Sequence, residues 1–272
     1  MRDIYIGARR IADDTDPYVI ADIGLDPWSD LERAEVLFLQ AAMAGANGIM
    51  LPPEALRPLV SYDAPAGQPY GLRRPDPHGI RAFGRAEYAR VAELAEGLRL
   101  DLLPTVADLA TVEFLAGVDP RTHAIRIAPE ALTDLPLLTA AAQLGRPVLL
   151  GVYGASPAEI SKAVDTVLAV NDQLALVQCA APQPKTPQDL NLAGIVTLLA
   201  DHPDLVVGFS GQDVCPEQSW IAYAVGARLI EKRLSTRRGP GRRPSLDPLG
   251  LIRYDGQSRW GGSVAPARVT GS

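Results

Sequence analysis

Short apolar runs recur along the chain, and each has about the length of one buried strand. The segments between them carry apolar residues at every third or fourth position, which is the period of an amphipathic helix. Near-continuous apolarity is typical of parallel strands that are covered on both faces. The eight predicted strands are Tyr18–Gly24, Asn47–Pro52, Leu100–Val106, His123–Pro129, Pro147–Tyr153, Leu174–Ala180, Leu205–Gly211 and Leu229–Ser235.

Helices are predicted in the segments between the strands, and one begins with a complete capping signal. Ser156, Pro157 and Glu159 place a serine at the N-cap, a proline at the first helical position and a glutamate three residues after the cap. The predicted helices are Asp30–Ala44, Arg85–Leu98, Asp108–Leu115, Leu135–Leu144, Pro157–Val170, Gln188–Ala200 and Pro216–Val225.

Strict alternation of strands and helices predicts an α/β protein with a parallel sheet, and eight strands favour a single (β/α)8 TIM barrel. The first strand lacks the glycine fingerprint of a dinucleotide-binding fold. We expect the barrel to cover residues 1–250, with a long Pro/Gly-rich connection at 53–83 and a truncated, irregular tail at 251–272. A site in such a barrel forms at the C-terminal ends of the strands.

Composition narrows the class of partner. The 272 residues carry a net charge of −6 and have a pI near 5.1, which argues against a nucleic-acid binder. Two cysteines, Cys179 and Cys215, do not suggest a disulfide framework. We see neither a signal segment nor a membrane span, and therefore expect a soluble cytoplasmic protein without membrane or nucleic-acid partners.

Charged residues near the predicted strand ends are the candidate catalytic and binding residues. Asp22 and Glu231 are candidate acid/base groups, and Tyr153 is a candidate proton donor, although a tyrosine packed at the rim fits equally. Arg126 and Arg233 lie within predicted strands. Each arginine has two interpretations: it forms an internal ion pair, or its planar guanidinium binds a carboxylate or phosphate of a ligand. For Arg126 the candidate ion-pair partners are Asp22, Glu130 and Glu231.

Metal ligands are scarce. The chain has three histidines, His78, His123 and His202, and all lie away from the predicted C-terminal strand ends, so we expect no metal. The alternative is a hard cation bound by Asp22, Glu231 and Gln212. The segment from Arg237 to Arg243 holds four arginines after the last strand. It is either a solvated loop or a clamp for an anion or an acidic partner.

An ordered series of motifs resembles the sialic acid synthase (N-acetylneuraminate synthase) family. Tyr18–Gly24 followed by Ser29–Glu32 is similar to the family's IAEIG and DLE opening. Further matches follow in order along nearly the whole barrel: Ala44–Asn47, Leu103–Thr105, Ile125–Ala128, Leu135–Leu138, Gln178–Cys179, Asp189–Leu192, Val207–Ser210, Glu231–Lys232, Gly239–Pro240 and Ser245–Pro248.

That resemblance implies condensation of phosphoenolpyruvate with an amino-sugar aldehyde at a divalent metal, and this sequence departs from it at the implied site. The family's metal-binding histidines align with Gln212 and Arg233, and its phosphoenolpyruvate-binding lysines align with Met50 and Arg126. A family serine aligns with Gly151, and we expect the family's C-terminal antifreeze-like domain to be absent. The matching positions are Thr105, Asn191, Ser210 and Glu231.

Two hypotheses follow. The first is a diverged carbohydrate-biosynthetic enzyme that acts on an anionic sugar or keto acid, by carbon–carbon bond formation or cleavage or by elimination, without a cofactor. The second is a non-catalytic pseudoenzyme that binds a sugar-type ligand or supports a partner enzyme; a homodimer is also possible. The candidate residues are Asp22, Glu231 and Tyr153 for catalysis, and Arg126, Arg233, Thr105, Ser210, Gln212, Asn191 and Arg237 for substrate binding.

Overall fold

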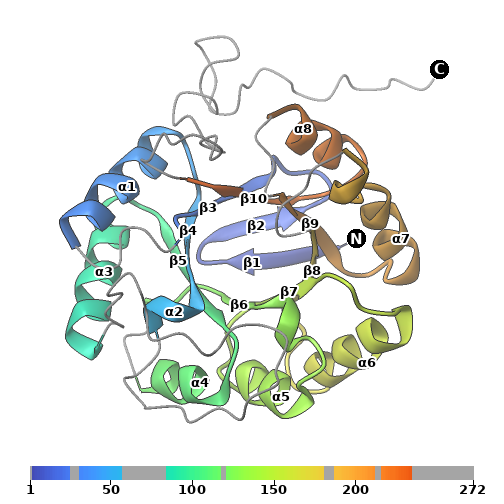
Figure 1. Cartoon of the computed structure of the whole chain (residues 1–272), viewed down its shortest axis with the longest axis horizontal. Coiled ribbons are helices and arrows are strands. Elements are labelled where there is room, and N and C mark those ends of the chain that lie inside the picture. Colours follow the sequence, from blue (N-terminus) through green and yellow to red (C-terminus); the bar gives the residue numbers. More distant parts are fainter. Residues whose placement is uncertain are drawn as a thin grey trace.

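Eight parallel strands close into a barrel (Figure 1). The computed structural model describes residues 2–24, 31–56, 84–117, 121–180, 187–211 and 216–234. Hydrogen bonding runs around the barrel in the order β10-β3-β4-β5-β6-β7-β8-β9. The strands are β3 (Tyr18–Asp22), β4 (Gly48–Leu51), β5 (Asp101–Val106), β6 (Ile125–Ile127), β7 (Val148–Val152), β8 (Leu174–Cys179), β9 (Val206–Gly211) and β10 (Leu229–Arg233).

Helices surround the barrel, and side chains cap several of their first turns. Asp108 and Asp134 each accept a backbone N–H three residues on, and Ser156 with Glu159 forms the complete capping box that the sequence predicts. The helices are α1 (Leu31–Met43), α2 (Pro53–Leu56), α3 (Arg85–Gly97), α4 (Leu109–Ala116), α5 (Leu135–Gln143), α6 (Pro157–Leu168), α7 (Ala193–Asp201) and α8 (Pro216–Ala224), with 3-10 turns η1 (Pro129–Ala131) and η2 (Pro187–Leu190).

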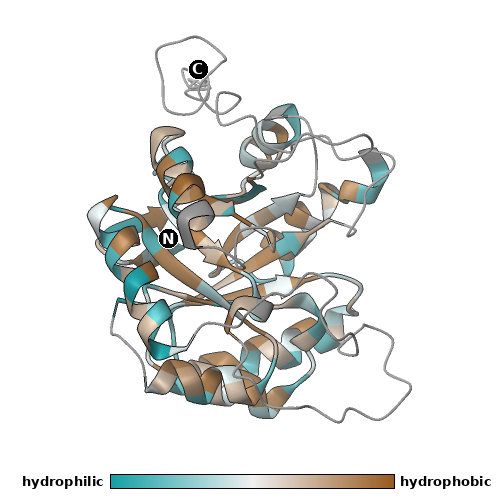
Figure 2. Cartoon of the chain, turned by 60° about the vertical axis from the view of Figure 1, so that its left-hand side comes forward, coloured by the Kyte–Doolittle hydropathy of each residue, from teal (hydrophilic) through white to brown (hydrophobic). Residues whose placement is uncertain are grey.

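Alternation along each strand divides the apolar side chains into two clusters. Residues such as Ile49, Leu150 and Leu176 point outward and pack with the inner faces of the helices. Their neighbours, such as Leu149 and Val177, point into the barrel. Figure 2 shows apolar residues concentrated on the strands and on the inner faces of the helices. Because both faces of every strand are covered, the strands read as continuous apolar runs in the sequence.

An antiparallel hairpin, β1 (Asp3–Ile6) and β2 (Arg9–Ala12), closes the N-terminal end of the barrel. Ile4, Ile6 and Ile11 are buried in the same cluster as Tyr18 and Ala175, which face into the barrel. In Figure 1 the hairpin crosses the interior of the ring of strands. The barrel is therefore plugged at one end, and only its C-terminal end can open to a ligand.

Polar contacts lie at the N-terminal end of the barrel, next to this hairpin. Tyr18 donates its hydroxyl to Asp101 Oδ2 at 2.6 Å, and His123 Nε2 lies 3.6 Å from Asp101 Oδ1. Burial raises the pKa of both Tyr18 and Asp101. Gly7 turns the hairpin at φ +57, and a side chain there would collide with the Asp101 carboxylate. This end of the barrel is a packed and hydrogen-bonded structural base.

The sequence predicted the fold well and missed one element. All eight barrel strands and seven helices are confirmed, with ends shifted by a few residues, whereas the β1–β2 hairpin was not predicted. The segment 53–83 begins with the short helix α2 rather than with irregular chain, and residues 57–83 and 235–272 lie outside the described residues. Among the helices of the described ranges, none has the length and apolarity needed to cross a bilayer.

The hairpin plug predicts a matched pair of mutations. Ile11→Ala, at a fully buried position that faces the barrel, should lower the free energy of unfolding by about 2–5 kcal/mol, because it removes buried methylene groups and leaves a cavity. Tyr5→Ala, on the exposed face of the same hairpin, should change it by less than about 0.5 kcal/mol. Urea unfolding followed by circular dichroism measures both, and equal losses would show that the hairpin does not plug the barrel.

Candidate functional site

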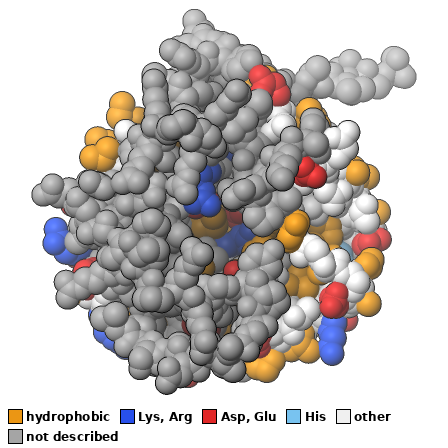
Figure 3. Space-filling model, viewed as in Figure 1, with side chains coloured by type: hydrophobic (Ala, Val, Ile, Leu, Met, Phe, Trp, Pro, Cys, Tyr) orange, Lys and Arg blue, Asp and Glu red, His pale blue; other side chains and the backbone are white. Residues whose placement is uncertain are grey.

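A layer of polar side chains fills the C-terminal end of the barrel interior. Strand alternation places these residues inward, above the apolar layer that contains Ile20, Leu149 and Val177. Figure 3 shows basic and acidic side chains in the hollow at the centre of this face. The inward-facing residues at this level are Asp22, Met50, Thr105, Arg126, Gly151, Cys179, Ser210, Glu231 and Arg233.

The central contact is an ion pair between Arg126 and Glu231. Arg126 donates Nε to Glu231 Oε1 at 2.6 Å and Nη2 to Oε2 at 3.2 Å, in a two-pronged geometry. β6 and β10 are four places apart in an eight-stranded ring, so the pair spans the lumen. The two side chains are 4% and 1% exposed. Of the two interpretations of Arg126, the internal ion pair is the one that the structure contains.

Two further acceptors hold the Arg126 guanidinium in place, and a glycine leaves room for it. Nη2 donates to Cys179 Sγ at 3.1 Å, and Nη1 donates to the carbonyl oxygen of Ile127. A Cβ atom at Gly151 would collide with Nη1, so the guanidinium lies where a side chain at position 151 would be. Burial is the largest single influence and lowers the pKa of Arg126, but the charges and hydrogen bonds of Glu231 and Cys179 together outweigh it and raise that pKa. Burial also raises the pKa of the Cys179 thiol.

A second ion pair lies between neighbouring strands nearer the rim. Arg233 Nε and Asp22 Oδ2 are 3.0 Å apart, and Asp22 Oδ1 accepts the backbone N–H of Gly24 at 3.0 Å. Asp22 is buried, whereas about a third of the Arg233 side chain is exposed (34%). Burial raises the pKa of Asp22 even though Arg233 and the Gly24 N–H favour the charged carboxylate. A carboxyl group with a raised pKa at a barrel mouth is suited to proton transfer.

Thr105 and Ser210 complete the layer. Thr105 is level with Arg126 across the β5–β6 ladder, and Ser210 is level with both Cys179 and Glu231. The buried hydroxyl oxygen of Thr105 has no hydrogen-bond partner within the described part of the chain. Because an unpartnered buried hydroxyl is costly, this atom is suited to a ligand or to water. The structure therefore brings together six of the predicted site residues: Asp22, Thr105, Arg126, Ser210, Glu231 and Arg233.

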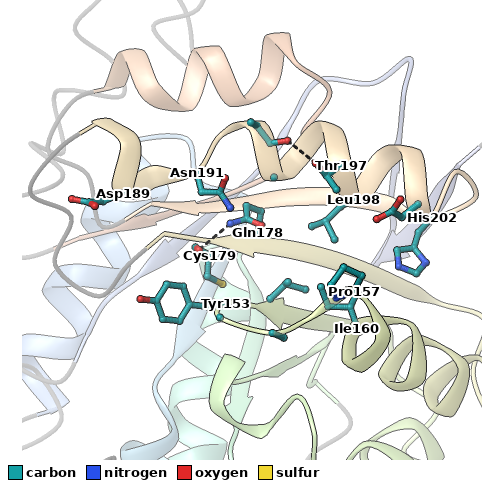
Figure 4. Close-up of a pocket in the computed structure, with 16 residues that line it drawn as sticks. Tyr153, Pro157, Ile160, Gln178, Cys179, Asp189, Asn191, Thr197, Leu198 and His202 are labelled. Carbon is teal, nitrogen blue, oxygen red and sulfur yellow. Dashed lines mark hydrogen bonds between the residues drawn. The ribbon is translucent and has the colours of Figure 1, made fainter.

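Two other predicted site residues, Tyr153 and Asn191, lie away from this layer, and two more lie outside the described residues. Tyr153 is exposed and, with Asn191, lines a pocket between α6 and α7 (Figure 4). Because β7 ends at Val152, Tyr153 lies past the last inward-facing position of that strand, Gly151. Gln212 and Arg237, together with the rest of the Arg237–Arg243 segment, lie outside the described residues. Their predicted roles stay predictions.

The family resemblance implies a bound metal, and the side chains at the aligned positions decide whether one fits. Of the two aligned histidine positions, Arg233 carries a cation without a lone pair for a metal and is paired with Asp22, while Gln212 lies outside the description. Among the described residues, no three His, Cys, Asp or Glu side chains are grouped so that they could hold a metal ion. Within the described ranges, the side chains therefore do not supply the donors of the family's metal site.

Sequence reasoning missed the two glycines that accommodate the arginines. Gly151 lies under the Arg126 guanidinium, and a Cβ atom at Gly24 would collide with Nη1 of Arg233. The change from serine to glycine at position 151 was visible in the family resemblance, and pairing it with the change to Arg126 could have indicated the contact. Cys179 was read only as a buried thiol, although it accepts a hydrogen bond from Arg126.

Comparison with known proteins gives consistent matches. The NeuB family profile matches residues 80–253, well over half of the chain. The Bacillus subtilis spore coat polysaccharide biosynthesis protein SpsE is 27% identical over 246 residues, covering 86% of this chain and 64% of that protein. The Drosophila melanogaster N-acetylneuraminate-9-phosphate synthase is 24% identical over 243 residues, covering 86% and 65%. The chain spans a little under two thirds of the length of these relatives.

A solved structure shows the same relationship. The N-acetylneuraminic acid synthetase of Leptospira borgpetersenii serovar Hardjo-bovis, determined in complex with citrate, has 25% sequence identity to this chain. The alignment covers 93% of this chain and 86% of that one, with a TM-score of 0.77. The barrel fold and the family resemblance are thus supported by sequence and by structure.

The Arg126–Glu231 pair predicts a strongly non-additive mutant cycle. Arg126→Met and Glu231→Leu should each lower the free energy of unfolding by about 3–5 kcal/mol, because each leaves one buried charge without its partner. The double variant should be more stable than either single variant, since neither charge remains. Urea unfolding of the four proteins gives the coupling free energy. Additive losses would show that the two side chains do not depend on each other.

Asp22 predicts a pH-dependent stability difference. A raised pKa means that the folded state binds a proton more tightly than the unfolded state, so Asp22 contributes most below the unfolded pKa of about 3.9, and this contribution falls as pH rises through the folded pKa. The unfolding free energy of the wild type minus that of Asp22→Asn should therefore decrease from pH 4 toward pH 7. A difference that grows with pH over this range would contradict the raised pKa.

Proposed function

Because the chain belongs to the NeuB family, we propose that it is a diverged carbohydrate-biosynthetic enzyme that acts on an anionic sugar or keto acid. Carbohydrate biosynthesis is the family-level role: its relatives include SpsE and synthases named for N-acetylneuraminate 9-phosphate and N,N'-diacetyllegionaminic acid. The motif series in the sequence predicted this family, and the profile match confirms it. The substrate and reaction of this chain are the proposed part.

The Asp22–Arg233 pair is the observation that carries the proposal. It places a partly exposed guanidinium at the open end of the barrel, beside a buried carboxyl group with a raised pKa. A guanidinium in this position can bind a carboxylate or phosphate. Asp22 can then give or take a proton at a carbon or oxygen atom next to that anion. The unpartnered Thr105 hydroxyl, deeper in the same layer, supplies a further hydrogen bond.

The family's usual route does not fit this interior. The position aligned with a phosphoenolpyruvate-binding lysine is Arg126, whose guanidinium is bonded to Glu231, Cys179 and the Ile127 carbonyl. The position aligned with a metal-binding histidine is Arg233. We therefore propose a reaction that uses neither the metal nor the phosphoenolpyruvate contacts of the family. In this reaction Glu231 acts as the charge partner of Arg126 rather than as an acid or base.

A second candidate function is non-catalytic binding. The mutual Arg126–Glu231 contact favours it, because an ion pair that satisfies both partners removes two charged groups from chemistry. In that case the barrel would bind the same class of anion through Arg233, and Asp22 would only hold that arginine in place. A partner enzyme would then carry out the reaction.

Anion binding tests the shared part of both candidates. Calorimetric titration with phosphoenolpyruvate, pyruvate and a sugar phosphate should show binding of at least one of them, weakened at least tenfold, or about 1.4 kcal/mol, in Arg233→Ala. Arg90→Ala, which removes an exposed arginine on α3, controls for the loss of a positive charge. No binding of any of these anions to the wild type would refute the proposal.

Turnover separates the two candidates. After the bound anion is identified, NMR of ligand and protein should show its slow conversion by the wild type, and the same ligand should bind Asp22→Asn without conversion. Binding without conversion by the wild type, together with a stable complex with another protein, selects the non-catalytic candidate. Mn²⁺-dependent condensation of phosphoenolpyruvate with a sugar would overturn the metal-free reaction.

A further inference from the structure

A cavity of about 310 Å³ opens between α6 and α7, outside the barrel wall (Figure 4). α6 packs closely against α5, and α7 packs against β8 and β9, whereas α6 and α7 make little contact with each other. The floor of the cavity includes the outward face of β8. The cavity is therefore distinct from the polar layer in the barrel, although Tyr153 and Cys179 border it at the C-terminal end of the strands.

Gln178 is the most unusual residue of this floor. The outward positions of β8 are otherwise apolar, with Leu174 and Leu176 in the cluster that packs against the helices. Gln178 is 5% exposed, and its Nε2 donates to the Cys179 carbonyl oxygen at 3.2 Å. Its Oε1 has no hydrogen-bond donor within the described part of the chain. Because Gln178 lines the cavity, this acceptor is available to a ligand or to water.

Gly194 leaves room for two amides to converge. A Cβ atom at Gly194 would lie 2.7 Å from Gln178 Oε1 and 2.8 Å from Asn191 Nδ2. Any larger residue on this turn of α7 would therefore displace one of the two side chains. The acceptor of Gln178 and the donors of Asn191 thus lie at one point of the cavity wall. An acceptor and a donor side by side are suited to a hydroxyl group, which both donates and accepts.

The remaining lining defines the charge of a ligand. Ile160 and Leu198 form apolar walls, and Tyr153 offers an exposed ring at one end. Asp189 and Asp201 also line the cavity, and its described lining contains neither lysine nor arginine. Carboxylates in the lining disfavour phosphates and carboxylic acids. The cavity thus selects against the anions that the barrel mouth attracts.

We propose that the α6–α7 cavity is a binding site for an uncharged sugar. Amide groups for hydroxyls, apolar walls and an aromatic ring for the C–H face of the pyranose are the features of the lining that match this ligand. A volume of about 310 Å³ accommodates a single hexose unit. The site is separate from the anion site proposed for the barrel mouth. It would hold a neutral sugar, or one unit of a longer glycan, on the outside of the barrel.

The test uses methyl glucoside and N-acetylglucosamine as probes, with glucose 6-phosphate as the charged counterpart. Saturation-transfer NMR and titration of isotope-labelled protein should show binding of at least one neutral probe, with a Kd of about 1–10 mM, as expected for so small a ligand. Gln178→Leu should weaken this binding at least tenfold without lowering Tm, because leucine replaces an amide in an apolar layer. Tyr153→Ala, at an exposed position, should weaken it without affecting folding.

Controls separate this site from the barrel mouth. Gln143→Leu, the same substitution at an exposed position on α5, should leave sugar binding unchanged, as should Arg233→Ala. Failure of both neutral probes to bind at 50 mM, or equal binding by the wild type, Gln178→Leu and Tyr153→Ala, overturns the proposal. Tighter binding of glucose 6-phosphate than of the neutral sugars, lost in Arg233→Ala, would assign the sugar to the barrel mouth instead.

Discussion

The buried ion pair between Arg126 and Glu231 is the interaction on which the C-terminal half of the barrel depends. Removing two charges from water costs several kcal/mol per ion, and only close contacts with good geometry recover that cost. The bidentate contact, the Ile127 carbonyl and the Cys179 sulfur provide those contacts. The pair joins opposite sides of the ring, and each side chain fixes the position of the other across the lumen.

This constraint divides the protein into regions of different polarity. The hairpin end is closed by apolar packing and by the Tyr18–Asp101 hydrogen bond. The lumen contains charges that neutralise each other, while Arg233 at the rim is partly exposed to solvent. Outside the wall, the α6–α7 cavity contains carboxylates and amides. An anion and a neutral sugar would therefore bind on opposite sides of the β8 strand.

The barrel could be predicted because its signal is local: each buried strand and each amphipathic helix has its own period in the sequence. The hairpin was missed although Ile4 and Ile6 alternate before Gly7, because four-residue strands give little signal. The sequence left three acidic residues as possible partners of Arg126, because no local pattern shows which strand lies across the lumen from it. Tyr153 was placed at the mouth because the end of β7 could not be located to within one residue: the strand ends at Val152, so alternation no longer sets the direction of the Tyr153 side chain.

Gly151 has a consequence for how this interior can have arisen. The family resemblance aligns a serine with this position and a lysine with Arg126. A side chain at 151 collides with the arginine in its present place, so Arg126 can hold this position only while residue 151 is glycine. A return of position 126 to lysine would leave an empty space over Gly151 and a buried Glu231 with a poorer partner. Positions 126 and 151 are thus coupled, and a substitution at either one changes what the other can accommodate.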